Sequence, residues 1–191
     1  MDNILLIGAG GHAKSCIDVI ESDNKFNIIG LIDKAINKTF FNYSILGNDD
    51  DLLNLKSKSS FAFVTMGQIG YNSTRSNLFN LIKEIGFKIP TIISPFSYIS
   101  KHSFVDRGSI IMHGAIINSN VKIGYNTIIN SKALIEHDCN ISNNCHISTG
   151  AIINGGVTIS KNTFIGSGAI IRNGINIPEN SFIKAGSLIS K

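Results

Sequence analysis

The sequence predicts a small α/β domain followed by a parallel β-helix, and three observations support this fold class. From Ile99 to the end of the chain, every sixth residue is aliphatic and β-branched. Before that point, short uninterrupted apolar runs alternate with segments of helical spacing. Pro90 and Pro95 lie where the first pattern gives way to the second. We therefore expect two domains, at 1–95 and 96–191.

The six-residue period fits neither regular element alone, because strands alternate with period two and helices repeat every 3.6 residues. A coil of short flat sides satisfies it, with one β-branched side chain per side pointing into a narrow interior. Three sides make a coil of eighteen residues, so residues eighteen apart are expected to stack. An Ile-rich sandwich, the alternative, would not keep sixteen positions in register. These positions are Ile99, Val105, Ile111, Ile117, Ile123, Ile129, Ile135, Ile141, Ile147, Ile153, Ile159, Ile165, Ile171, Ile177, Ile183 and Ile189.

The first domain has the alternation of strands and helices that predicts a parallel sheet. Uninterrupted apolar runs that end near glycine or aspartate are typical of buried strands, and a glycine after a periodic segment is typical of a helix end. We expect strands at 3–8, 27–33, 61–66 and 88–93, and helices at 11–22, 49–56 and 74–86.

A glycine-rich turn joins the first expected strand to the first expected helix. It reads GAGGHA from Gly8 to Ala13, and Asp33 closes the next strand. Such a turn brings backbone N–H groups and a helix N-terminus close to a phosphate, and the acid can reach a ribose or a base. The domain is therefore Rossmann-like, but the turn lacks the last glycine of the dinucleotide fingerprint, which disfavours NAD. The alternative is a tight turn that needs glycine only for steric reasons.

The composition excludes several classes of protein. The 191 residues are 43% hydrophobic and 16% charged, as in a folded domain. The net charge of +4 comes from scattered residues without a basic run, so binding to nucleic acid is not indicated. We find no signal peptide, no apolar stretch long enough for a membrane span and no metal-ligand spacing, and we expect a cytoplasmic protein. Cys139 and Cys145 occupy small-residue positions of consecutive β-helix sides, so we interpret them as packing residues.

One histidine of the β-helix stands between two acids, Glu136 and Asp138. A neutral imidazole at His137 can take a proton from an amine or a hydroxyl, and either carboxylate would fix its tautomer. Gly155 follows eighteen residues later, so it should lie one coil above His137, where its N–H can polarise a carbonyl. His146 lies half a coil away and would reach this site only across an interface with another subunit. An ordinary surface histidine is the alternative for His137.

Three stretches of the chain together resemble a known family. They are Gly8–Lys14 (GAGGHAK), Leu134–Asp138 (LIEHD) and His146–Gly156 (HISTGAIINGG). The chain resembles the sugar O-/N-acyltransferases with a left-handed β-helix of hexapeptide repeats, which include bacillosamine-type nucleotide-amino-sugar N-acetyltransferases and sialic acid O-acetyltransferases. The resemblance implies a left-handed coil, a homotrimer, and acetyl-CoA bound in the groove between adjacent β-helices.

The resemblance also implies roles for individual residues. His137 would be the catalytic base, supported by Asp138 or Glu136, and Asn130 would face the substrate amine. The residues expected to contact acetyl-CoA are His146 near the thioester, Gly155 through its N–H, and Ser167 and Ala185 along the pantetheine. The residues expected to hold the nucleotide of a nucleotide-linked sugar are Gly10, Gly11, His12, Asp33, Lys34 and Gly67.

The leading hypothesis is acetyl transfer from acetyl-CoA to the amino group of a nucleotide-linked 4-amino-4,6-dideoxysugar for a surface glycan such as an O-antigen or a capsule. Three alternatives remain. One is O-acetylation of sialic acid, which uses the same base and the same acyl donor. The second is a non-catalytic scaffold that binds a nucleotide-sugar, and the third is a dinucleotide-dependent enzyme.

Overall fold

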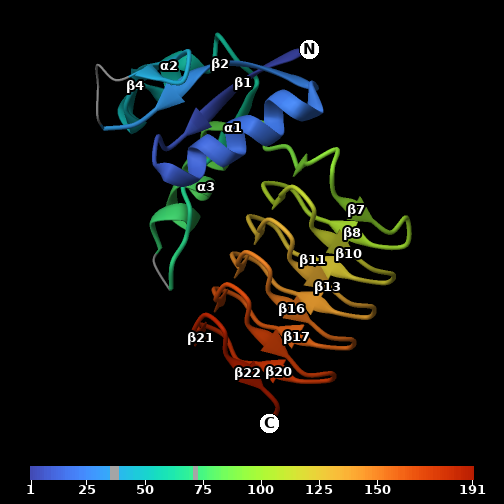
Figure 1. The fold of residues 1–191 in the computed structure, drawn as a ribbon. Helices are drawn as coiled ribbons and strands as arrows, with labels where there is room; N and C mark the ends of the chain where they lie inside the picture. The colour runs from blue at the N-terminus through green and yellow to red at the C-terminus, as the bar shows by residue number, and fades with distance from the viewer. Residues whose placement is uncertain (35–38, 71–72) are drawn as a thin grey trace. The chain divides into compact units, whose positions relative to one another are not determined.

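The computed structural model describes residues 1–34, 39–70 and 73–191, which form two compact units. The first unit comprises Met1–Gly67 and Ser73–Pro90, and the second comprises Thr91–Lys191 together with Gln68, Ile69 and Gly70. Figure 1 shows the first unit as a small α/β layer structure and the second as a stack of coils. No helix in the described part of the chain is both long and apolar enough to cross a membrane.

The first unit is built on a five-stranded sheet of order β3-β4-β2-β1-β5. Strands β1, β2, β4 and β5 pair in parallel, and β3 is antiparallel to β4. Helix α1 contacts β2, and α3 contacts β5 and α2. The element bounds are β1 Asp2–Ile7, α1 Gly11–Asp23, β2 Phe26–Ile32, β3 Thr39–Phe40, β4 Tyr43–Gly47, the 3₁₀ turn η1 Asp49–Asp51, α2 Leu52–Leu55, β5 Phe61–Val64 and α3 Thr74–Ile85.

The expected strand at 88–93 is divided between the two units. Lys88 forms a single parallel bridge with Phe61, whereas Ile92–Ile93 is the first strand of the β-helix, β6. Pro90 stands between them and lacks the N–H that a continuous ladder would need. The strands β3 and β4 were not expected, because their segment lacks the apolar runs of the other strands.

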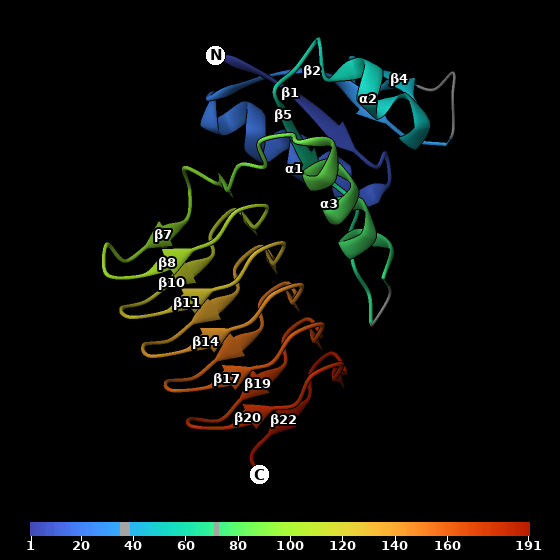
Figure 2. The same cartoon turned by 180° about the vertical axis from the view of Figure 1, so that it is seen from behind.

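The second unit is a left-handed parallel β-helix of three sheets, which we name faces A, B and C. The coils lie one above another along its axis (Figure 2). Face A contains β6 Ile92–Ile93, β9 Ile110–Ile111, β12 Ile128–Ile129, β15 His146–Ile147, β18 Phe164–Ile165 and β21 Phe182–Ile183. Face B contains β7 Tyr98–Ile99, β10 Ile116–Ile117, β13 Leu134–Ile135, β16 Ile152–Ile153, β19 Ile170–Ile171 and β22 Leu188–Ile189. Face C contains β8 Phe104–Val105, β11 Lys122–Ile123, β14 Asn140–Ile141, β17 Thr158–Ile159 and β20 Asn176–Ile177.

The register confirms the eighteen-residue coil. Leu134 pairs with Ile152 on face B, and His146 pairs with Phe164 on face A. The second residue of each strand is the β-branched residue of the six-residue repeat, and these side chains are fully or almost fully buried from Ile111 to Ile177. Cys139 and Cys145 are buried in the same core, and burial raises the pKa of Cys145 to about 12. The cysteines therefore act as packing residues, as the repeat predicted.

The chain turns at three corners per coil, which we name AB, BC and CA after the faces that they join. From Gly108 to Gly186, every corner has one residue in the left-handed region, with φ between +54° and +71°. Glycine and asparagine tolerate this conformation better than other residues do, which explains why they recur with a period of six. The residues are Gly108, Gly114, Asn120, Asn126, Lys132, Asp138, Asn144, Gly150, Gly156, Asn162, Gly168, Gly174, Asn180 and Gly186.

Candidate active site

His137 lies at the BC corner, directly after β13, and its side chain is exposed. Its Nδ1 is 2.8 Å from Oδ2 of Asp138. Asn120, one coil below, donates from Nδ2 to Oδ1 of Asp138 at 2.7 Å. The hydrogen bond from Asn120, and after it the one from His137, hold the pKa of Asp138 below its usual value. Because an ionised carboxylate can only accept, His137 carries its proton on Nδ1 and leaves a lone pair on Nε2.

Gly155 lies one coil above His137, as the spacing predicted. An added Cβ at Gly155 would be 2.7 Å from Cε1 and 2.8 Å from Nε2 of the His137 ring. The imidazole therefore rests against the backbone of Gly155, and only glycine leaves room for it there. The N–H of Gly155 has no acceptor among the described residues. The site thus combines a ring nitrogen with a lone pair and a neighbouring N–H that is available to an oxygen.

The second carboxylate beside His137 has a different partner. Oε2 of Glu136 accepts a hydrogen bond from Nδ2 of Asn118 at 3.0 Å, and Glu136 is half-buried. The described contacts of the His137 ring nitrogens include Asp138 but not Glu136. The geometry therefore gives Asp138 the position from which a carboxylate orients the ring.

His146 lies on face A, with its side chain 6% exposed. Its Nδ1 is 2.5 Å from the carbonyl oxygen of Gln68, and its Nε2 is 3.2 Å from Nδ2 of Asn130, which lies at the AB corner. A carbonyl oxygen can only accept, so Nδ1 of His146 carries the proton. Oδ1 of Asn130 already accepts from the N–H of Ser131 at 2.8 Å, so the amide nitrogen of Asn130 faces the ring. His146 is therefore a neutral imidazole that accepts a hydrogen bond at Nε2.

Ser167 and Ala185 also lie at the AB corner, one coil apart, and both are exposed. Oγ of Ser167 is 2.9 Å from Oγ of the buried Ser148. The structure thus brings Asn130, Ser167 and Ala185 to one corner, and His146 to the adjoining face A. His137, Asp138 and Gly155 lie at the BC corner. The two groups flank face B, because the chain enters that face at the AB corner and leaves it at the BC corner.

In the first unit, the glycine turn lies at the carboxyl ends of β1, β2 and β5. The N–H of Ala9 donates to Oδ2 of Asp33 at 2.7 Å, which fixes the carboxylate beside the turn. Gly10 is the N-cap of α1 and Gly11 its first residue. An added Cβ at Gly67, which follows β5, would be 3.2 Å from Cβ of His12. The segments predicted to hold a nucleotide therefore meet at one edge of the sheet, where parallel sheets bind ligands.

A pocket of about 250 Å³ opens at this edge and includes Asp33 and Lys34 among its lining residues. The other lining residues are Ile7, Gly8, Ile32, Asp49, Met66, Thr74 and Leu78. The buried Arg75 donates from Nη1 to the carbonyl of Val64 at 2.8 Å and to that of Met66 at 2.5 Å, which ties α3 to the end of β5. Burial lowers the pKa of Arg75 to about 10.

Comparisons with known proteins agree with both units. Residues 3–82 match the family described as the PglD N-terminal domain. The structure of a histidine-to-asparagine mutant of perosamine N-acetyltransferase from Caulobacter crescentus, in complex with CoA and GDP-perosamine, is 26% identical, with a TM-score of 0.94 over 100% of this chain and 90% of that one. The acetyltransferase domain of PglB from Neisseria gonorrhoeae is 26% identical, with a TM-score of 0.92 over 100% and 92%. No sequence among curated proteins matches significantly.

These matches support the assignment to the sugar acyltransferases of the hexapeptide-repeat family, which the sequence resembles. The PglB domain has also been solved in complex with acetyl coenzyme A, and that structure is 25% identical, with a TM-score of 0.90 over 98% of this chain and 92% of that one. The family and the fold class predicted from the sequence are both confirmed.

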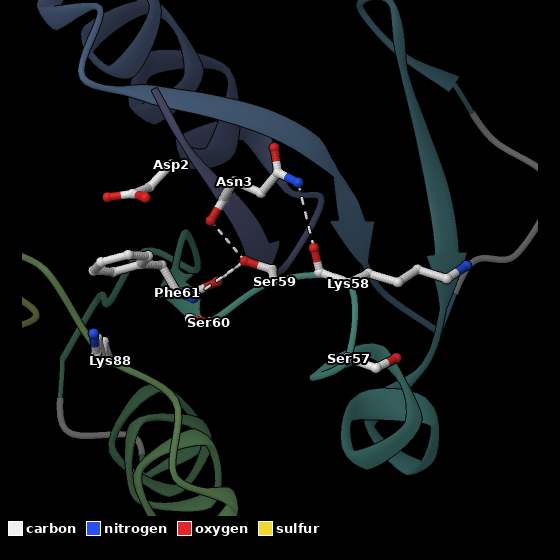
Figure 3. A pocket seen from close by; sticks show the side chains of 8 residues that line it. All are labelled: Asp2, Asn3, Ser57, Lys58, Ser59, Ser60, Phe61 and Lys88. Atoms are coloured by element: carbon white, nitrogen blue, oxygen red, sulfur yellow. Dashed lines mark hydrogen bonds between the residues drawn. The ribbon is translucent and has the colours of Figure 1, made fainter.

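A second pocket, of about 320 Å³, lies at the opposite edge of the sheet in the first unit (Figure 3). The hydroxyl of Ser59, which lines this pocket, donates to the carbonyls of Asn3 and Phe61. Lys58 and Lys88 extend to opposite sides of it, and Nζ of Lys88 lies over the Phe61 ring at 5.5 Å. Its cations do not converge on a common point, so this pocket has no arrangement suited to a phosphate.

Sequence reasoning missed several residues that shape these sites. Asn120 precedes Asp138 by eighteen residues, so the coil length could have identified it, whereas Gln68 lies far from its partners along the chain. Asp49 and Thr74 line the 250 Å³ pocket but belong to no recognisable motif. Within the described residues, no group of three or more His, Cys, Asp or Glu side chains is placed to hold a metal ion.

Proposed function

We propose that this acyltransferase transfers an acetyl group from acetyl-CoA to the amino group of a nucleotide-linked 4-amino-4,6-dideoxysugar. Such a sugar would be a building block of a surface glycan such as an O-antigen or a capsule, made in the cytoplasm where acetyl-CoA is available. The observation that carries the proposal is that Nε2 of His137, which has a lone pair, lies beside the backbone of Gly155, whose N–H has no acceptor among the described residues. Two relatives support the acyl donor and the acceptor, since one was crystallised with CoA and GDP-perosamine and the other with acetyl coenzyme A.

The proposed chemistry is direct attack on the thioester. Nε2 of His137 takes a proton from the amine as its nitrogen bonds to the thioester carbonyl carbon, and Asp138 stabilises the imidazolium that forms. The N–H of Gly155 stabilises the tetrahedral oxyanion. The intermediate then expels the thiolate of CoA, which takes up a proton, and the N-acetyl sugar remains. A cysteine acyl-enzyme is disfavoured, because Cys139 and Cys145 are buried and burial raises the pKa of both thiols.

We further propose that the site is shared between copies of a homotrimer. The outward residue of every strand on face B is apolar or aromatic, whereas face C presents mostly polar residues there. In a ring of three copies with face B turned inward, the BC corner of one copy meets the AB corner of the next. His137 would then face Asn130, Ser167 and Ala185 of the neighbour, with His146 behind Asn130. The outward residues of face B are Tyr98, Ile116, Leu134, Ile152, Ile170 and Leu188.

The first unit would hold the nucleotide. The N–H groups at the start of α1, at Gly10 and Gly11, suit a diphosphate, and the pocket beside Asp33 and Lys34 suits the nucleoside. His12 and Gly67 pack against each other at the rim of the same edge.

The first test is release of free thiol from acetyl-CoA by the purified protein. The acceptors are UDP-, dTDP- and GDP-linked 4-amino-4,6-dideoxysugars, with free and CMP-linked sialic acid as the competing class. We expect turnover on one amino-sugar and its loss in His137→Ala. Turnover on sialic acid alone would move the assignment to O-acetylation, and acetyl-CoA binding without turnover on any acceptor would favour a scaffold.

The shared site is tested by mixing two variants of greatly reduced activity. His137→Ala lacks the base at the BC corner but keeps an intact AB corner. Asn130→Ala lacks the amide at the AB corner but keeps an intact BC corner. If the two corners of one site come from different copies, trimers formed from equal amounts of both variants regain up to about one quarter of the wild-type activity, from the random pairing of corners. A mixture that stays inactive, although both variants are shown to exchange subunits, contradicts the shared site.

A further inference from the structure

Gln68 belongs to the segment that follows β5, yet it groups with the β-helix. Its side chain is 3% exposed, and its Nε2 donates to the carbonyl of Asn144 at the CA corner, at 3.1 Å. Two residues later, an added Cβ at Gly70 would lie 3.4 Å from the Phe182 ring on face A. The side-chain bond to Asn144 therefore anchors the main chain of this segment over face A.

This anchor places the carbonyl of Gln68 on His146. Nδ1 of His146 donates to that carbonyl, which leaves Nε2 as an acceptor. Nε2 then accepts a hydrogen bond from Nδ2 of Asn130. Since Oδ1 of Asn130 is bonded to the N–H of Ser131, the amide cannot turn over without losing both bonds. One N–H of this amide is used on His146, and the other has no acceptor among the described residues.

We infer that Gln68 and His146 are positioning residues that act through Asn130. The chain of hydrogen bonds from Gln68 to His146 to Asn130, which we name the Gln68 relay, presents the second amide N–H of Asn130 at the AB corner. The relay gives the site a fixed donor for an acceptor oxygen of the substrates. This inference rests on the proposed function for its substrates but not for its hydrogen bonds.

The tautomer of His146 tests the relay without any substrate. The full-length protein is labelled with ¹⁵N-histidine, and long-range ¹H–¹⁵N correlations report which ring nitrogen holds the proton. We expect the Nδ1–H tautomer in the wild type, with the His146 signals assigned by their absence in His146→Gln. Gln68→Ala should convert this single tautomer into a mixture, and Ile69→Ala should not, because Ile69 is 79% exposed. An Nε2–H tautomer in the wild type, or no change in Gln68→Ala, would overturn the inference.

A double-mutant cycle tests whether Gln68 acts through Asn130. Gln68→Ala should lower kcat by roughly 10- to 100-fold and leave the KM for the nucleotide-sugar within about twofold, because the donor is misplaced while the nucleotide pocket is untouched. Adding Gln68→Ala to Asn130→Ala should cost no further activity. Losses that multiply would show that Gln68 acts by another route. If no acceptor is turned over by the wild type, the proposed function fails, and the tautomer measurement still decides the relay.

Discussion

His137 and His146 are nine residues apart on one β-helix, and both imidazoles carry the proton on Nδ1, but their surroundings differ in charge and in exposure. His137 is exposed and donates to the ionised Asp138, whereas His146 is buried and donates to the neutral carbonyl of Gln68. A carboxylate stabilises the imidazolium that forms when Nε2 takes up a proton. A carbonyl does so far less, and Nε2 of His146 already holds the amide of Asn130.

The comparison shows that the tautomer alone does not make a base. His137 has a lone pair on Nε2 beside the N–H of Gly155, so it can both accept a proton and work next to an oxyanion. In His146 the lone pair on Nε2 accepts the hydrogen bond that positions Asn130. Two histidines with the same protonation pattern are thus suited to different tasks, and substitutions at or near each can separate these tasks.

The largest effect is expected for removal of the base. His137→Ala should lower kcat by about 10²- to 10⁴-fold, the usual contribution of general base catalysis, and leave the melting temperature nearly unchanged because the side chain is exposed. Thiol release and thermal unfolding measure the two quantities. His102→Ala, at another exposed histidine of the β-helix, is the matched control and should retain activity. Equal activity of His137→Ala and the control would remove His137 from the mechanism.

The next effect tests whether the two corners meet across face B. Ile170→Glu puts a charge on the apolar face B, where Ile170 is 38% exposed in a single copy. We expect dissociation to monomers in sedimentation analysis and a loss of activity of at least about tenfold, although His137 is intact. Asn176→Glu, at the exposed outward position of β20 on face C, should stay trimeric and active. An active monomer would show that one chain holds a complete site.

A smaller effect is expected from Gly155, the glycine one coil above the base. In Gly155→Ala the new methyl group meets the His137 ring, which can swing away, so kcat should fall by roughly 10- to 100-fold while the protein stays folded. In Gly166→Ala the methyl group would lie 2.4 Å from the backbone nitrogen of Ala185, which cannot move alone. That variant should lose roughly 1 to 3 kcal/mol of unfolding free energy, as for overpacking. Denaturant unfolding distinguishes them, and equal destabilisation of both would argue against a movable ring over Gly155.

The smallest effect concerns the carboxylate that orients His137. Asn120→Gly keeps the left-handed backbone but removes the leading cause of the lowered pKa of Asp138, so this pKa should rise toward its usual value. The lowered pKa keeps Asp138 ionised through its usual titration range. The stabilisation that its hydrogen bonds provide is therefore complete above that range and is lost as the pH falls through the lowered value. A ¹³C titration of the carboxyl group should show this shift, while activity near pH 7 stays within about twofold. In Asn162→Gly, at the CA corner, the titration should match the wild type.

The sequence determined most of the β-helix, because the hydrophobic side chains that fill it recur at a fixed interval. Gly155 could be placed over His137 from the same interval. The left-handed corner residues carried an equally regular signal, and Asn120 below Asp138 follows from it. The spacing could not show which of Glu136 and Asp138 contacts His137. Side chains on either side of a corner residue point in different directions, and the six-residue period does not specify these directions.

The contacts of His146 lay beyond sequence reasoning for a different reason. Gln68 is 78 residues away and comes from a segment outside the repeat, so no periodicity relates the two. The resemblance pointed to His146 as a residue near the thioester, whereas the structure shows both ring nitrogens engaged with protein groups. The role of His146 toward acetyl-CoA remains a prediction, and the Gln68 relay gives it a specific form.

The eighteen-residue register also limits how the gene of such a protein can change in length. A duplication or deletion of one whole coil keeps every corner residue in its own column, whereas a change of six residues would move all later corners to the next face. Length variants among related chains should therefore differ by complete coils. Between His137 and Gly155 even a complete extra coil would separate the base from its N–H, so this part of the β-helix cannot change in length without loss of the site.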